Sequence, residues 1–322
     1  MSKSSEPTFE SWAAAQKQRY KPTDEQLAAF RDLFGNASPS AAEMSEIASC
    51  IARPCIKPWD GSPPITDLWC VLKSAVDELP SQSDKLVALL LELQRLPDGK
   101  GVMGPDPWFV DLPLFDNFVT EWWDVSYPDP HEGRQAWANE NAFLAKLTAQ
   151  AGGIEMFVAQ SQRGGVCLRR ALERTPWDQS SPTYIDPDPP MEGDWMIVSS
   201  DDEDSGYEDD ESEEGAEEDE EGVEDPNLQI TVLDVLVPAA AQWIRFCPRE
   251  LYEKAVAGVE MDMEYDCNGT NFGTKMGWSL ERWEYWRKRF EEVSTMEMLE
   301  VDTRRIAKEA AERMSTFSQE HT

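Results

Sequence analysis

Helix formation is signalled most clearly in the stretch Trp278-Ser279-Leu280-Glu281-Arg282-Trp283-Glu284-Tyr285-Trp286-Arg287-Lys288-Arg289-Phe290-Glu291-Glu292-Val293. Its large apolar residues, from Trp283 to Val293, are spaced by three or four positions, which places them on one face of a helix. Ser279 precedes this face and is a favoured N-cap residue. The stretch therefore predicts a helix that begins after Ser279 and buries an aromatic face against other helices.

The same helical spacing of apolar residues recurs through most of the chain, interrupted by proline and glycine. Leu86, Leu89 and Leu90 belong to one such stripe, which begins after Ser83 and stops at Pro97. No run shows the sustained alternation that is typical of a half-buried strand. The expected fold is therefore all-α, an irregular multi-helix bundle. The other expected helices cover residues 24–34, 40–52, 65–79, 83–96, 115–124, 135–149, 154–173 and 302–317.

The region after residue 228 is less clear at its start. Residues 230–233 are rich in β-branched side chains, so they are compatible with either a strand or a helix. Pro238 stands before an alanine-rich run that ends at Trp243, and proline is favoured at the first position of a helix. We therefore expect a helix that begins at Pro238, and a further helix that Pro248 opens or kinks.

The charge of the chain is strongly negative and unevenly distributed. The 322 residues include 29 Lys and Arg against 63 Asp and Glu, for a net charge of −34. Residues 201–225 contain 17 of the acidic residues and no basic one, which leaves −17 for the remainder. Such a segment cannot bury enough apolar surface to offset its chain entropy. Together with the preceding Pro- and Ser-rich residues, it predicts a long acidic disordered insertion over residues 176–227.

This insertion divides the expected helical domain into two parts. The first part covers residues 23–175, after an N-terminal tail or short helix at residues 1–22, and the second covers residues 228–317, before a tail at 318–322. The aromatic stripe near Trp283 needs an apolar partner, which a fragment of under 100 residues supplies poorly on its own. We therefore expect both parts to fold as one unit.

The composition also narrows the expected partners. An acidic surface repels phosphates and anionic headgroups, so direct binding to nucleic acid or membranes is not expected, whereas basic protein partners are. The first residues resemble no signal peptide, and no apolar run reaches the length that spans a bilayer. These features predict an intracellular protein, cytoplasmic or nuclear, whose six cysteines are free thiols.

Motifs for catalysis or cofactor binding are weak in this sequence. Residues 99–104 match the G-x-G-x-x-G pattern, but prolines follow where a dinucleotide site needs a helix N-terminus. With only His131 and His321, a histidine-based triad would depend on His131, which lies in a proline-rich turn. We therefore predict no catalytic residue, cofactor or metal site.

One predicted helix carries a polar residue on its apolar face. Asn141 shares a face with Trp137 and Leu144, so its amide must be satisfied there. It either bonds to a neighbouring helix end or loop in the core or lines a small pocket. The candidate pocket or structural residues are Trp137, Asn139, Asn141, Gln242, Trp243 and Trp283.

The predicted insertion contains one short motif with a known binding mechanism. Met196-Ile197-Val198 is followed by Ser199, Ser200, Asp201, Asp202, Glu203 and Asp204. This order resembles a SUMO-interacting motif, in which an apolar tripeptide adds as a strand to a sheet edge and the acidic tail faces basic residues. The alternative is a tract that only keeps the protein soluble.

Five segments of the chain, and the order in which they follow one another, resemble a fungal family known as domain of unknown function 3632. The resemblance extends over roughly residues 60–315. It implies an intracellular helical protein and assigns no activity, cofactor or catalytic residue. The segments are Glu121–Asp124, Trp137–Ala145, Ala171–Glu173, Pro238–Ile244 and Trp278–Trp286.

Two functions are compatible with these observations. The first is a non-enzymatic interaction or scaffold protein with an acidic docking tract. The second is an enzyme or small-molecule binder with a helical pocket. A pocket protein should show polar side chains that converge near Asn139, Asn141 or Gln242, whereas a scaffold should show an exposed apolar groove.

Overall fold

The structure is a computed structural model that describes residues 6–56, 64–96, 133–150, 155–173, 226–259 and 277–321, together with Leu112, Phe115 and Val119. The protein is all-α, as the sequence predicts, and these residues contain no strand. The α-helices are α1 (Phe9–Arg19), α2 (Asp24–Gly35), α3 (Ala41–Ala52), α4 (Pro64–Glu78), α5 (Ser83–Leu93), α7 (Arg134–Gln150), α8 (Glu155–Leu172), α9 (Pro226–Phe246), α10 (Pro248–Ala257), α11 (Leu280–Val293) and α12 (Val301–Glu320). Two short 3₁₀ helices are η1 (Arg53–Ile56) and η2 (Pro80–Gln82).

Side-chain caps explain where several helices begin. Thr23 and Ser40 accept hydrogen bonds from the backbone N–H groups of Gln26 and Glu43, whose side chains bond back to the caps. These reciprocal bonds satisfy N–H groups that have no partner inside the helix. Ser279 accepts from the Arg282 backbone N–H at 3.1 Å, which confirms the predicted start of α11.

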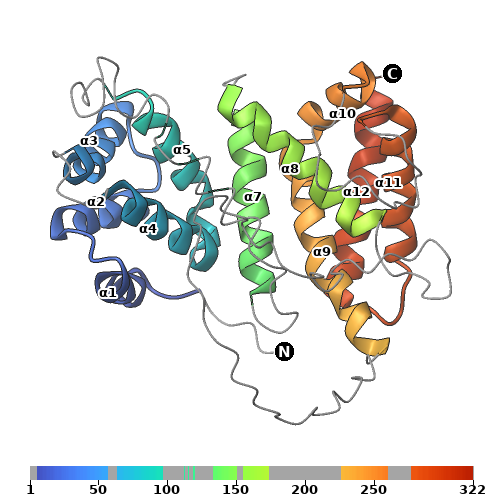
Figure 1. Ribbon diagram of the computed structural model, residues 1–322, viewed down its shortest axis with the longest axis horizontal. Coiled ribbons are helices and arrows are strands. Elements are labelled where there is room, and N and C mark those ends of the chain that lie inside the picture. The colour runs from blue at the N-terminus through green and yellow to red at the C-terminus, as the bar shows by residue number, and fades with distance from the viewer. Residues whose placement is uncertain are drawn as a thin grey trace, which may run out of the picture.

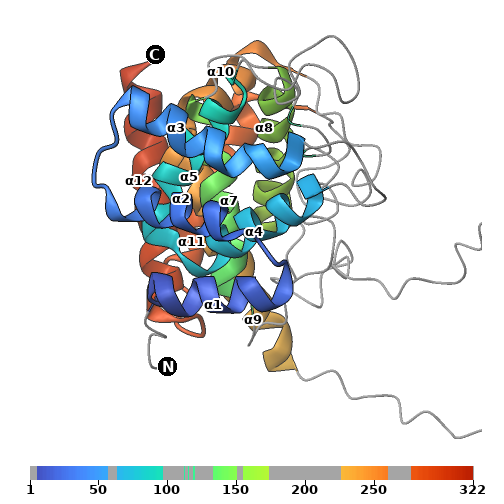
Figure 2. The same ribbon diagram turned by 90° about the vertical axis from the view of Figure 1, so that its left-hand side faces the viewer.

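Helix α7 lies at the centre of the molecule (Figure 1). It contacts α4 and α5 on one side and α8 and α9 on the other. Figure 2 shows the first five helices in front of α7 when that side faces the viewer. One continuous apolar core extends from Trp12 in α1 to Met314 in α12. The segments before residue 173 and after residue 226 therefore share this core.

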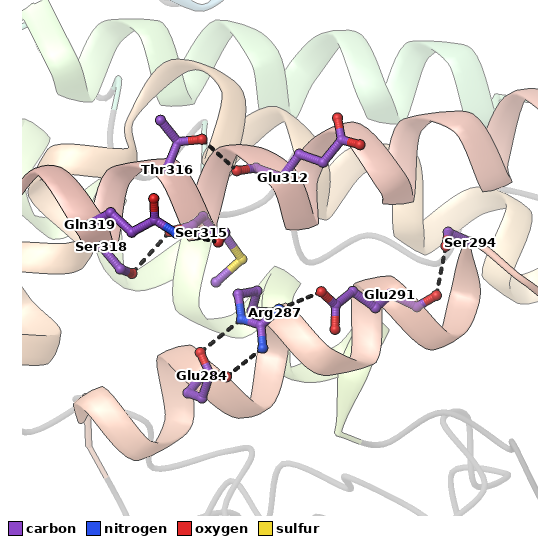
Figure 3. A network of polar contacts seen from close by, with 10 residues as sticks. Glu284, Arg287, Glu291, Ser294, Glu312, Ser315, Thr316, Ser318 and Gln319 are labelled. Carbon is purple, nitrogen blue, oxygen red and sulfur yellow. Dashed lines mark hydrogen bonds and ion pairs between the residues drawn. The ribbon is translucent and has the colours of Figure 1, made fainter.

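Helices α11 and α12 pack side by side at the edge of the molecule opposite to the first five helices. Figure 3 shows polar contacts on these two helices, in which Arg287 contacts both Glu284 and Glu291 of α11. On α12, the Ser318 hydroxyl donates to the Met314 carbonyl at 2.9 Å. These contacts lie within single helices, and exposed ion pairs of this kind individually contribute little to stability.

The predicted start of α9 is wrong. Pro238 lies inside the helix, which begins at Pro226 and includes the ambiguous residues 230–233. A proline within a helix removes one backbone hydrogen bond. Leu236, Val237 and Ala239 are buried around it, because α9 packs against α7, α8 and α12. Tertiary packing therefore outweighs the local preferences, and Pro226 takes the first position that Pro238 was expected to hold.

Most of the other predicted helices agree with the structure within one or two residues where they can be compared. Two ends differ by three residues: α5 ends at Leu93 instead of residue 96, and α12 continues to Glu320 and takes up most of the predicted tail 318–322. Pro248 opens α10 as expected. Of the predicted helix 115–124, only Phe115 and Val119 are described, and both are helical and buried. Residues 174–225, which make up nearly all of the predicted insertion, lie outside the described residues.

Candidate functional site

The two strongest candidates, Asn141 and Trp243, contact each other in the core. The Trp243 indole N–H donates to Asn141 Oδ1 at 2.8 Å, and Asn141 Nδ2 donates to the Trp137 carbonyl at 2.9 Å. Neither Asn141 nor Trp243 is exposed to solvent. Because both ends of the amide are engaged, this contact connects α7 to α9 and satisfies the buried amide.

Gly164 of α8 packs closely against the Trp243 ring of the same contact. A Cβ atom at this position would lie 2.7 Å from Trp243 Cε3 and 2.8 Å from Trp243 Cδ2. Glycine inside a helix costs about 1 kcal/mol relative to alanine, so its presence here reflects the close approach of the indole ring. Gly164 is not among the residues predicted from the sequence, although it stands beside Gly165 in a predicted helix, and a glycine inside a helix often has a packing reason.

Asn139 faces a different neighbour, helix α4. Its Nδ2 donates to the Asp77 carbonyl at 2.8 Å. Beside it, the Lys73 ammonium lies 2.6 Å from Asp77 Oδ2 and 2.9 Å from Glu140 Oε1. Burial disfavours the charged ammonium, but the two carboxylates outweigh it and raise the pKa of Lys73. Asn139 and Asn141 therefore serve two different helix contacts and do not converge.

The remaining candidates are also dispersed. The Trp283 indole N–H donates to Ser318 Oγ at 3.0 Å, and its ring meets Tyr252 edge-on at 5.2 Å between centroids. Trp137 is buried on α7, and Gln242 is half-buried on α9 beside Trp243. The structure thus brings together Asn141, Trp137 and Trp243, and leaves Trp283 in a separate contact between α10, α11 and α12.

A second buried polar cluster was not predicted. Glu173, directly after α8, has no exposed surface. Its Oε1 accepts from Arg282 Nε at 2.9 Å and from the Trp286 indole N–H at 2.7 Å. Arg169 Nε lies 3.6 Å from Oε2. Burial lowers the pKa of the Arg282 guanidinium, and the charge of Glu173 opposes this shift. The spacing of Arg282 and Trp286, four positions apart, would have placed both on one helix face.

These two clusters pair the segments on which the family resemblance depends. Trp137–Ala145 meets Pro238–Ile244 through the Asn141–Trp243 bond, and Ala171–Glu173 meets Trp278–Trp286 through Glu173. A family model described as "Protein of unknown function (DUF3632)" matches residues 69–290. The chain belongs to the DUF3632 family. No curated protein and no solved structure matched it.

The DUF3632 match contains both polar clusters and extends from α4 into α11. Helices α1, α2, α3 and α12 lie outside the matched residues. The bonds of Asn141 and Glu173 therefore lie in the part of the chain that matches the family model. In this chain they give the tryptophan-rich segments a structural role, because they join helices.

A small cavity lies elsewhere, between the end of α1, α2, η1 and α4. Its volume is about 90 Å³, and Tyr20, Lys21, Phe30 and Asp67 are among the residues that line it. Lys21 adopts a left-handed backbone conformation with φ of 51°. Pockets for organic ligands usually measure about 300–1,000 Å³. None of the residues predicted for a pocket lines this cavity.

Within the described part of the chain, no helix has the length and apolar character needed to cross a membrane. The same residues include no group of three or more His, Cys, Asp or Glu placed to hold a metal ion. The motif at residues 196–204 lies outside the described residues.

Proposed function

We propose that this protein is a non-enzymatic interaction or scaffold protein, whose helical core presents residues 201–225 to basic protein partners. The observation that carries the proposal is the separation of charge along the chain. Seventeen carboxylates and no basic residue occupy this acidic tract, out of 63 acidic residues in total. Such a segment attracts cationic surfaces over a Debye length of roughly 8 Å at physiological salt.

The structure around the acidic tract supports this role. Glu173 is held by Arg282 and Trp286 on the N-terminal side of the undescribed segment, and α9 begins at Pro226 on its C-terminal side. Helices α8 and α9 both pack into the same core. Residues 174–225, which include the tract, are therefore joined to the folded core at both ends.

The enzyme or small-molecule alternative finds less support. A pocket lined by Asn139, Asn141 or Gln242 would need polar atoms that face an open space. Both ends of the Asn141 amide, and the Asn139 amide as well, are engaged in bonds between or within helices. We therefore propose that this protein acts by binding protein partners in the cytoplasm or nucleus, and that it binds neither nucleic acids nor membranes directly.

A charge-neutralised variant tests the proposal. All 17 carboxylates of residues 201–225 are changed to their amides, and binding to a fluorescent lysine-rich peptide is measured between about 50 and 200 mM salt. We expect the full chain to bind, with an affinity that falls as salt rises, and the variant to lose this binding with an unchanged melting temperature. Equal binding by both proteins would leave the acidic tract as a solubilising segment.

The SUMO-like motif is tested separately. Ile197→Ala combined with Val198→Ala should abolish binding to SUMO, because the apolar side chains of the added strand supply the specificity. The same double variant should still bind the lysine-rich peptide, since its acidic residues are intact. SUMO binding that survives both substitutions would remove this motif from the proposal.

A further inference from the structure

Exposed arginines gather where α9 ends and α10 begins. Arg245 lies in the last turn of α9, Arg249 in the first turn of α10, and Arg313 on α12. All three are exposed. None forms an ion pair within the described part of the chain. By contrast, the exposed Arg305 pairs with both Asp302 and Glu309 of its own helix.

Contacts place Arg313 and Lys146 beside the end of α9, and Arg249 follows Phe246, the last residue of α9, by three positions. Arg313 Nε donates to the Ile244 carbonyl at 3.0 Å. The Arg245 guanidinium lies 5.0 Å from the centroid of the Phe246 ring, and Lys146 Nζ of α7 lies 4.7 Å from the same centroid. Lys146 is nearly buried and pairs with Asp84, so Arg245, Arg249 and Arg313 form the accessible basic patch.

The position of Arg249 is electrostatically unfavourable within the helix that carries it. The first turn of a helix bears a partial positive charge, which disfavours a cation. Glu250 lies in the same turn, where its Oε2 accepts from the Cys247 thiol at 3.2 Å. Arg245 and Arg313 add to the positive potential. A patch of this kind in a chain with a net charge of −34 points to an anionic partner.

We infer that the basic patch binds the chain's own acidic tract, residues 201–225. Charge complementarity supports this choice, because the tract contains 17 carboxylates and the patch presents three guanidinium groups that form no ion pair among the described residues. The tract ends directly before Pro226, at the start of α9, whereas the patch surrounds the end of α9. Figures 1 and 2 show these two ends of α9 on opposite sides of the molecule.

The length of the chain allows this contact. The 21 residues of α9 span about 31 Å at 1.5 Å per residue. About ten extended residues cover that distance at roughly 3.3 Å each, so residues 201–215, which include 10 carboxylates, are far enough along the chain from Pro226 for contact with the patch. Attachment to the same chain gives the tract an effective concentration in the millimolar range, at which weak exposed ion pairs suffice.

This contact would regulate the proposed function. The inference rests on that function, because it assumes that the tract binds basic partners. Carboxylates that bind the basic patch are withheld from basic partners. A partner must therefore displace the patch, and loss of the patch should strengthen partner binding. The two ideas fail separately, because contact within the chain is measured with no partner present.

Zero-length crosslinking with a carbodiimide tests the contact in the full chain. Arg245→Lys combined with Arg249→Lys keeps the charge and supplies amines that couple to carboxylates. We expect crosslinks from these two positions to residues 201–225, and their loss in about 0.5 M salt, where screening is strong. Arg19→Lys is the matched control, because Arg19 is also exposed and forms no ion pair with another described residue, but lies on α1. Equal crosslinking from Arg19→Lys, or none from the two patch positions, would overturn the inference.

Mixing copies labelled with different nitrogen isotopes separates contact within a chain from contact between chains. Crosslinks that join two isotopes would show a second copy as the occupant and would also overturn the inference. A charge-reversed variant gives an independent measurement. Arg245→Glu with Arg249→Glu should raise the rate at which a glutamyl endopeptidase cuts the tract about tenfold, because the tract is released. Arg19→Glu with Lys288→Glu changes the charge equally and should leave this rate unchanged; an unchanged rate in the patch variant would contradict the contact.

Discussion

Trp243 and Asn141 are joined by a 2.8 Å hydrogen bond across 102 positions of sequence. The bond connects α9 to α7, so it links the chain after the acidic tract to the chain before it. Because both residues are fully buried, neither polar group has water as a substitute partner. The stability of the whole core should therefore depend on this pair.

Asn141→Leu should lower the free energy of unfolding by about 1–3 kcal/mol, because it leaves the buried Trp243 N–H without an acceptor. Trp243→Phe removes that N–H, so the double variant should lose less than the sum of the two single changes. Urea unfolding of the four proteins measures this coupling. Gln242→Ala, next to Trp243 on α9, is the control and should stay within about 0.5 kcal/mol. Strictly additive losses would show that the bond is not a coupled contact.

Gly164→Ala should destabilise the protein, although the same exchange in an ordinary helix interior is favourable by about 1 kcal/mol. The added Cβ would meet the Trp243 ring at 2.7 Å, and such overpacking typically costs about 1–3 kcal/mol. Gly35→Ala at the end of α2 is the matched control, because its Cβ would meet no atom within 4 Å. Thermal unfolding decides between them. A higher melting temperature for Gly164→Ala would contradict the close approach of α8 and α9.

Glu173→Gln should cost about 3–5 kcal/mol of stability, because it leaves Arg282 buried without its carboxylate. The amide oxygen still accepts from Trp286, which isolates the effect of the charge. Glu284→Gln is the control: Glu284 pairs with Arg287 at the surface (Figure 3), where such pairs contribute about 0–1 kcal/mol. Equal losses in the two variants, measured by urea unfolding, would argue against a special role for the buried cluster.

The buried thiols should be unreactive in the folded protein. Burial raises the pKa of Cys55 and of Cys167 to about 12, so at pH 8 neither forms the reactive thiolate. Iodoacetamide followed by mass spectrometry should therefore modify the half-buried Cys50 and Cys70 before Cys55 and Cys167. Rapid labelling of Cys167 in the native protein would contradict the packing around α8.

These raised values also set the sign of a pH effect. Because the unfolded thiols lose their protons near pH 9 and the folded ones only near pH 12, the unfolded state binds fewer protons in this interval. The contribution of these two thiols to the free energy of unfolding should therefore be fully present below pH 9 and be lost as the pH rises to 12. Serine at positions 55 and 167 would remove this contribution, so the slope between pH 9 and 12 should become shallower.

The helices could be predicted from the sequence because their signals are local. Ser279 and the spacing from Trp283 to Val293 specify α11 without reference to any other part of the chain. Pro238 misled the prediction for the opposite reason, since the helix around it is stabilised by α7, α8 and α12. Local propensity carries no record of such neighbours.

The polar clusters could be predicted only in part. The face shared by Asn141 and Trp137 showed that a buried amide needed a partner, but not that Trp243 would supply it. The bonds of Glu173 to Arg282 and Trp286 join residues 109 and 113 positions apart. A single sequence does not reveal which distant residues meet, so the family motifs could be located before their contacts were known.

The anchoring of Glu173 and the entry into α9 at Pro226 also bear on how the family can vary. The entropy of closing a loop grows only with the logarithm of its length, so doubling the segment between these two points would cost about 0.6 kcal/mol. The helices on either side pack against one another through contacts that lie in α7, α8, α9 and α11. Insertions and deletions in this segment should therefore be nearly neutral for folding, which leaves its length and charge free to diverge among relatives that keep the same helical core.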